Sequence, residues 1–80
     1  MDRHEDHLVV RWSDARSSGT CRFDRIPGTS PEWLGSADEL LEGADRRQEA
    51  RILGAVGDWV GAAGLDLGVW HDDAGVEQLT

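Results

Sequence analysis

Residues 45–64 read DRRQEARILGAVGDWVGAAG, and they decide the fold because they predict the one long helix of this 80-residue chain. Asp45 and Gln48 form a capping box at its start, and Gly64 is a natural left-handed terminator. At about 100° per residue, apolar side chains gather on one side of the helix: Ile52, Val56, Trp59, Val60 and Ala63. The pattern therefore predicts an amphipathic helix over residues 46–63.

Four glycines at spacings of three, four and three residues line one strip of this helix: Gly54, Gly57, Gly61 and Gly64. Each internal glycine costs about 1 kcal/mol of stability relative to alanine. Close approach of another backbone, from the protein's own sheet or from a partner, would offset this cost. Drift toward glycine in a GC-rich genome is the alternative, and the absence of Lys, Asn and Tyr also favours such a genome.

Upstream of the helix, side chains alternate between two faces in residues 8–12 and again in residues 21–24. Residues 13–19 between them are rich in turn-forming residues, so the pattern predicts a β-hairpin. The expected register pairs Trp12 with Cys21, so that the apolar side chains of both strands share one face. On the other face, the same register brings Arg11 next to Arg22. These like charges repel each other unless that face is solvated or meets an acidic partner.

Between hairpin and helix, residues 26–31 hold two prolines and a glycine and predict a loop, and the capping pair Ser36 and Glu39 begins a short helix. Apolar side chains alternate with others in residues 65–70, and a turn then leads to residues 76–79. This pattern predicts a second hairpin. The order ββααββ favours an α+β fold: a two-layer sandwich whose antiparallel sheet is covered on one face by helices.

Length and composition indicate one small acidic domain, residues 1–80, in which residues 1–6 form a frayed terminus. A chain this short has no room for a deep active-site cavity. Cys21 stands alone, so neither an intramolecular disulfide nor a structural zinc site is expected. The sequence shows no signal peptide and no membrane-spanning run, so we expect a cytoplasmic protein without membrane contact.

Signals for catalysis are weak. His71 precedes Asp72, as a general base and its orienting carboxylate would, but adjacent residues in a turn rarely point at each other. His4 and His7 lie among acids, in a set that suits copper, nickel or zinc. We expect a protein that is not an enzyme and carries no cofactor or metal. An enzyme or metal carrier using these three histidines is the competing hypothesis.

The acidity of the chain is segregated. Residues 1–31 balance five arginines against five acids, whereas residues 32–80 set three arginines against eleven acids. Helix capping explains a few of these carboxylates, Asp38, Glu39 and Asp45 among them. Across about 30 Å a DNA strand carries about nine phosphates, a comparable number. If most of these acids share one face, they predict a protein partner with a basic surface and disfavour direct nucleic-acid binding through that face. If they are scattered over the surface, they provide only solubility.

Four tryptophans are many for so short a chain, and tryptophan is enriched at binding hot spots. We expect two of them to anchor a partner: Trp33, in a loop or first turn, and Trp70, which faces away from the apolar side of its strand. The candidate partner-binding residues are Asp38, Glu39, Glu42, Asp72, Asp73, Trp70 and Trp33.

Together these features favour a non-enzymatic, protein-binding inhibitor of a basic, nucleic-acid-handling target. Small phage anti-defence proteins of the anti-CRISPR kind act as such inhibitors, and immunity-like proteins cap the basic site of a toxin. In either case an acidic face can mimic nucleic acid. No motif ties the chain to such a family, so the hypothesis rests on size and charge. The alternative is an accessory subunit of a larger assembly that packs through its glycine strip and tryptophans, with a homodimer as one form.

Overall fold

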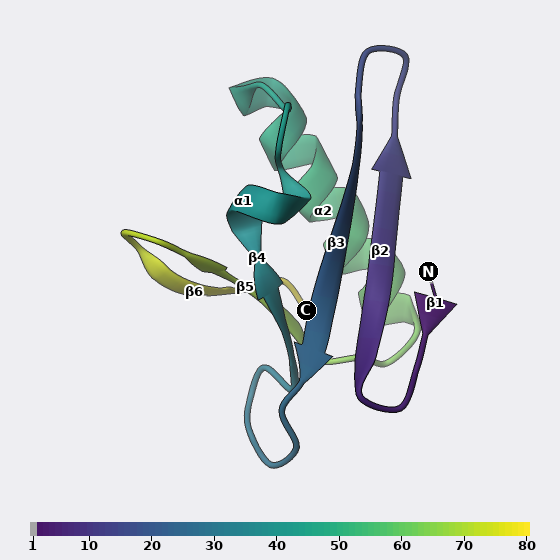
Figure 1. The fold of residues 1–80 in the computed structure, drawn as a ribbon, viewed down its shortest axis with the longest axis vertical. Coiled ribbons are helices and arrows are strands. Elements are labelled where there is room, and N and C mark those ends of the chain that lie inside the picture. The colour runs from purple at the N-terminus through teal and green to yellow at the C-terminus, as the bar shows by residue number, and fades with distance from the viewer. Residues whose placement is uncertain (1) are drawn as a thin grey trace.

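The computed structural model describes residues 2–80 as a six-stranded sheet with one main helix (Figure 1). The elements in chain order are β1 (Asp2–Arg3), β2 (His7–Ser13), β3 (Ser18–Arg25), β4 (Trp33–Ser36), α1 (Ala37–Leu40), α2 (Arg46–Ala62), β5 (Leu67–His71) and β6 (Gly75–Gln78). The strands lie side by side in the same order as in the sequence. The α+β class is thus confirmed, whereas the two-layer sandwich stays a prediction.

The prediction of a sheet that is antiparallel throughout is wrong, because β4 and β5 pair in parallel. The sequence analysis missed β4, which has four residues with a glycine among them and follows Pro31. Gly35 pairs with Phe23 on one side and with Val69 on the other. The chain returns from β4 to β5 through α1 and α2, and parallel strands require such a long crossover.

The N-terminal hairpin is confirmed, but its register differs by two residues from the expected one. Val10, rather than Trp12, pairs with Cys21. The reason is a tight turn, in which the backbone N–H of Asp14 donates to the carbonyl of Ser17 at 2.8 Å. Three residues expected to lie in the turn are therefore strand residues: Ser13, Ser18 and Gly19. The shift of two keeps the same side chains on the apolar face.

Residues 2–6, expected to be part of a frayed end, instead include β1, and Met1 lies outside the described residues. β1 pairs with the first half of β2. Arg11 donates to the carboxylate of Asp2 at 2.6 Å and does not lie opposite Arg22 as predicted. Pairing with an acid removes the like-charge contact that the expected register implied.

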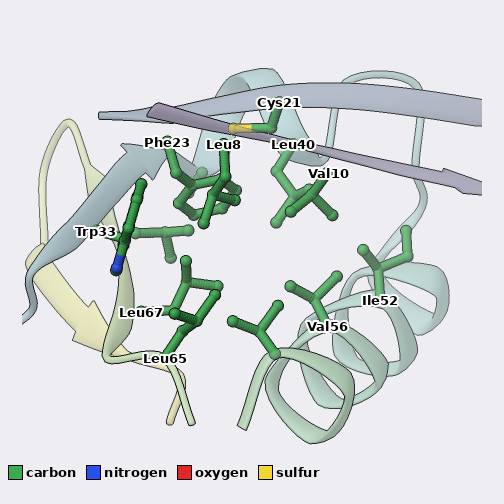
Figure 2. Packing of buried hydrophobic residues seen from close by; sticks show 13 residues of the cluster. Leu8, Val10, Cys21, Phe23, Trp33, Leu40, Ile52, Val56, Leu65 and Leu67 are labelled. Carbon is green, nitrogen blue, oxygen red and sulfur yellow. The ribbon is translucent and has the colours of Figure 1, made fainter. Parts of the chain in front are cut away.

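The core lies between the strands and α2 (Figure 2). Its buried apolar residues are Leu8, Val10, Cys21, Phe23, Trp33, Ala37, Leu40, Ile52, Val56, Val60, Leu65, Leu67 and Val69. The predicted capping box at the start of α2 is present, and Gly64 follows the helix with a φ of +74°. The main helix and its two ends are thus confirmed.

Two of the helix glycines contact the C-terminal residues of the same chain. A Cβ on Gly57 would lie 2.6 Å from the carbonyl oxygen of Leu79, and one on Gly61 would lie 3.6 Å from Cγ2 of Thr80. Trp59, which is predicted to lie on the apolar side of the helix, is 45% exposed and lies outside the buried core.

Candidate partner-binding surface

Parallel pairing of β4 with β5 brings α1 next to the β5–β6 turn. Ser36, the N-cap of α1, lies opposite Trp70 near the end of β5. The interaction of Asp72 in the turn with Asp38 in α1, chiefly a side-chain hydrogen bond, raises the pKa of Asp72 above its usual value. Two predicted site residues that are far apart in the sequence therefore meet on one surface.

Two further acids extend this surface. The charge of Asp73 also raises the pKa of Asp72, and Glu39 follows Asp38 in α1. We call these four exposed residues, Asp38, Glu39, Asp72 and Asp73, the acidic surface. Glu42 lies in the turn after α1 and is exposed, but no described contact joins it to the other four. The structure thus brings Asp38 together with Asp72 and Asp73, and Glu39 is grouped with them as the neighbour of Asp38 in α1.

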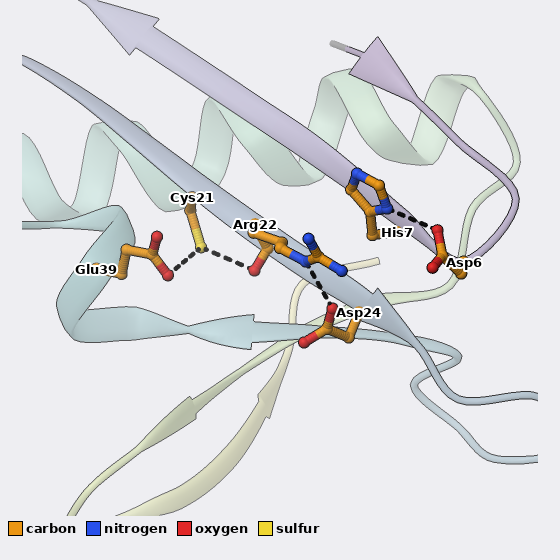
Figure 3. A network of polar contacts seen from close by, with 6 residues as sticks. All are labelled: Asp6, His7, Cys21, Arg22, Asp24 and Glu39. Atoms are coloured by element: carbon orange, nitrogen blue, oxygen red, sulfur yellow. Dashed lines mark hydrogen bonds and ion pairs between the residues drawn. The ribbon is translucent and has the colours of Figure 1, made fainter.

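Cys21 lies beside Glu39 and is fully buried on β3 (Figure 3). Its Sγ is 3.5 Å from the carbonyl oxygen of Ser36 and 4.0 Å from Oε2 of Glu39. Burial, followed by the charge of Glu39, raises the pKa of the thiol to about 12. Cys21 is a core residue, as predicted, and its thiol stays protonated at neutral pH.

An exposed apolar pair adjoins the acidic surface. Trp70 is 41% exposed and lies opposite Val76, which is 54% exposed, in the β5–β6 ladder. The outward orientation of Trp70 is confirmed, while Val76 was missed by the sequence analysis. The hairpin that carries both residues projects from the rest of the sheet (Figure 1). Apolar and acidic side chains are therefore available together to a partner.

Trp33 is not part of this surface. It is 1% exposed on β4, where the guanidinium carbons of Arg3 and Arg25 each lie 5.8 Å from its ring centroid. Its predicted role as an exposed anchor is wrong, because the residue begins a strand that lies between β3 and β5 rather than a helical turn. The indole ring instead fills the core beside Leu67, the residue with which it pairs.

The histidines have local partners. His7 Nδ1 lies 2.7 Å from Asp6, and the His4 ring stacks on the His7 ring at 4.4 Å. His71 Nε2 lies 3.0 Å from Glu77 rather than on the neighbouring Asp72. Within residues 2–80, no three His, Cys, Asp or Glu side chains gather in a way that could hold a metal ion.

A second surface was missed entirely. A depression between the β2–β3 turn and the start of α2 is lined by Arg16, Arg47 and Arg51. A signal for it was available in the sequence, because Arg47 and Arg51 are one helical turn apart at the start of the predicted helix.

Comparison with protein-family models, curated proteins and solved structures finds no match for this chain. No helix within residues 2–80 combines the length and the apolar character needed to cross a membrane.

Proposed function

We propose that this chain is a non-enzymatic inhibitor that binds a basic, nucleic-acid-handling protein through the acidic surface. The observation that carries the proposal is the contact between Asp38 and Asp72. Asp38, through a hydrogen bond and its charge, disfavours ionisation of Asp72, so their convergence costs stability in the free protein. A cationic partner surface would relieve this cost on binding.

The surroundings of the acidic surface support this proposal. Trp70 and Val76 offer an apolar contact beside the charges, and interfaces commonly combine a desolvated aromatic anchor with a polar rim. The net charge of −8 would speed the approach of a basic target, because complementary charge raises association rates. Carboxylates in this arrangement would stand in for phosphates, as in anti-CRISPR-like or immunity-like proteins acting in the cytoplasm.

Affinity capture from host lysate tests the proposal. We expect the wild-type chain to retain a basic protein that DNA or RNA displaces and that elutes as salt rises from about 0.1 to 1 M, because salt screens charge contacts. Asp72→Arg should lose this protein while staying folded, since the new guanidinium would face Asp38. The control is Asp58→Arg, which makes the same charge change on the exposed side of α2. Equal capture by both variants would refute a role for the acidic surface.

The alternative is an accessory subunit of a larger assembly. The 45% exposure of Trp59 supports this possibility. Gly57 and Gly61 do not, because the C-terminal residues of the chain already cover them. Light scattering discriminates between the two functions: a stable monomer at micromolar concentration disfavours the homodimeric form, whereas a dimer that Trp59→Ala dissociates would favour it.

A further inference from the structure

A depression opens between the β2–β3 turn and the start of α2. Its volume is about 400 Å³, within the range of small-molecule sites, about 300 to 1,000 Å³. The residues that line it are Asp14, Ala15, Arg16, Asp45, Arg47, Gln48 and Arg51. Three of the eight arginines of this acidic chain thus lie around one concave surface.

Three of the other five arginines in the protein differ from these three, because they are paired with carboxylates. Arg11, Arg22 and Arg25 each form an ion pair with a carboxylate. Within residues 2–80, the arginines of the depression have no carboxylate oxygen within 4.0 Å of a guanidinium nitrogen. Their charges are available to a ligand.

The positions of Arg47 and Arg51 are unfavourable in the free protein. Arg47 lies in the first turn of α2, where the positive end of the helix dipole disfavours cations. Arg51 follows four residues later on the same face, where like charges repel each other. A bound anion would relieve both effects.

The two carboxylates in the depression accept hydrogen bonds from neutral donors. Asp14 Oδ1 accepts from the backbone N–H groups of Arg16 and Ser17 at 2.8 and 3.0 Å, and its Oδ2 accepts from Nε2 of Gln48 at 2.7 Å. Asp45 accepts from the backbone N–H of Gln48 at 2.9 Å. Asp14 and Asp45 therefore fix the shape of the site. The hydrogen bond from the N–H of Arg16 is the main cause that lowers the pKa of Asp14, and the charge of Arg51 adds to it. In the part of the chain that the structure describes, however, no ion pair within 4.0 Å joins a guanidinium of the depression to either carboxylate.

An apolar groove continues from the depression. It has a volume of about 200 Å³ and shares Asp14, Gln48 and Arg51 with the depression. The other residues that line it are Trp12, Ser13, Ile52, Ala55 and Val56. Charged and apolar parts of one continuous surface therefore lie on either side of Gln48.

We propose that this surface binds a small organic phosphate with a planar ring, its phosphate on Arg16, Arg47 and Arg51 and its ring in the groove beside Trp12. Guanidinium groups match phosphate oxygens with paired hydrogen bonds, and the indole of Trp12 provides an aromatic contact for a ring. This site is separate from the acidic surface and does not depend on the proposed inhibitory function.

Calorimetric titration with adenosine monophosphate, adenosine and inorganic phosphate tests this proposal. We expect the monophosphate to bind most tightly, because only it occupies both parts of the surface. Arg47→Gln should weaken its binding about tenfold or more, the loss of roughly one charged hydrogen bond. Arg46→Gln is the matched control, since Arg46 is the adjacent exposed arginine outside the lining and its loss should leave affinity unchanged.

A second variant tests the apolar half separately. Ala55 is exposed, so Ala55→Phe would fill the groove without disturbing the core. We expect it to reduce affinity for adenosine monophosphate to that for inorganic phosphate, and to leave inorganic phosphate binding unchanged. The proposal is overturned if the wild-type chain binds none of the probes, if it binds inorganic phosphate as tightly as the monophosphate, or if Arg46→Gln weakens binding as much as Arg47→Gln.

Discussion

The carbonyl oxygen of Leu79 occupies the space beside α2 that a side chain at Gly57 would fill, 2.6 Å from the ideal Cβ position. The C-terminal segment is held there, because the N–H of Leu79 donates to the carbonyl of Leu67 at 2.9 Å. The hydroxyl of Thr80 further accepts from the N–H of Leu67 at 2.8 Å. The end of the chain thus joins β5 to the last turns of α2.

This contact predicts opposite effects for two alanine substitutions in α2. Gly57→Ala gains helix propensity, about 1 kcal/mol, but forces the backbone of Leu79 away, and we expect a net loss of about 1–2 kcal/mol in the free energy of unfolding. Gly54→Ala meets nothing within 4 Å and should gain up to about 1 kcal/mol. Urea denaturation of the two variants measures this difference. Stabilisation by both would show that the C-terminal segment does not pack on Gly57.

The Asp38–Asp72 contact predicts that Asp72→Asn stabilises the protein at neutral pH. The pKa of Asp72 is raised in the folded state, chiefly by the hydrogen bond with Asp38, so its ionisation opposes folding. This loss of stability is absent below pH 3.8, the ordinary pKa of an aspartate. It develops as the pH rises from there through the higher pKa that Asp72 has in the folded state. The stabilisation by Asp72→Asn should therefore be present at pH 7 and disappear in acid. Thermal unfolding across pH measures it, with Asp58→Asn as the control, and a gain that is independent of pH would contradict the contact.

Gln48 joins the β2–β3 turn to α2, and its side chain is buried beside Asp14. Gln48→Glu keeps the shape but replaces the donor with a second carboxylate, so we expect a loss of about 1–3 kcal/mol at pH 7. Protonation of the introduced carboxyl should reduce the loss as pH falls. Gln48→Leu removes the same donor without adding a charge, and its deficit should lack this recovery. If the free energies of unfolding of the two variants changed with pH in the same way, the carboxylate introduced by Gln48→Glu would not be in contact with Asp14.

The thiol of Cys21 should be unreactive in the native state. Because burial and the charge of Glu39 raise its pKa to about 12, very little thiolate exists at pH 8. We expect labelling by iodoacetamide to be slow in buffer and fast in denaturant. Glu39→Gln removes only the second cause, so protection should persist in that variant. Rapid labelling of the folded wild-type chain would show that the core around β3 opens readily.

The parts of the fold that follow from neighbouring residues could be predicted. The capping box of Asp45 and Gln48 and the helix that follows it depend on residues close in sequence, as do both hairpins. β4 could not be predicted, because a four-residue strand with a central glycine has little intrinsic preference and forms by pairing with β3 and β5. The burial of Trp33 follows from that pairing and was missed with it.

The acidic surface shows the same limit. The exposure of Asp38 and Asp72 could be expected from their positions in a first helical turn and a hairpin turn. Their contact could not, since it depends on the parallel pairing of β4 with β5. The arginines of the depression left a local signal in the sequence, but only the position of the β2–β3 turn brings Arg16 to them.

The parallel pair of β4 and β5 also determines which fragments of this chain can bind. α1 follows β4 directly, whereas Asp72 and Trp70 arrive only after the crossover through α2. A peptide spanning α1, or a truncated chain that ends before β5, would display half of the charges and no apolar anchor. If a partner binds this surface as proposed, it would bind only the folded chain and would not bind nascent or proteolysed copies that lack β5.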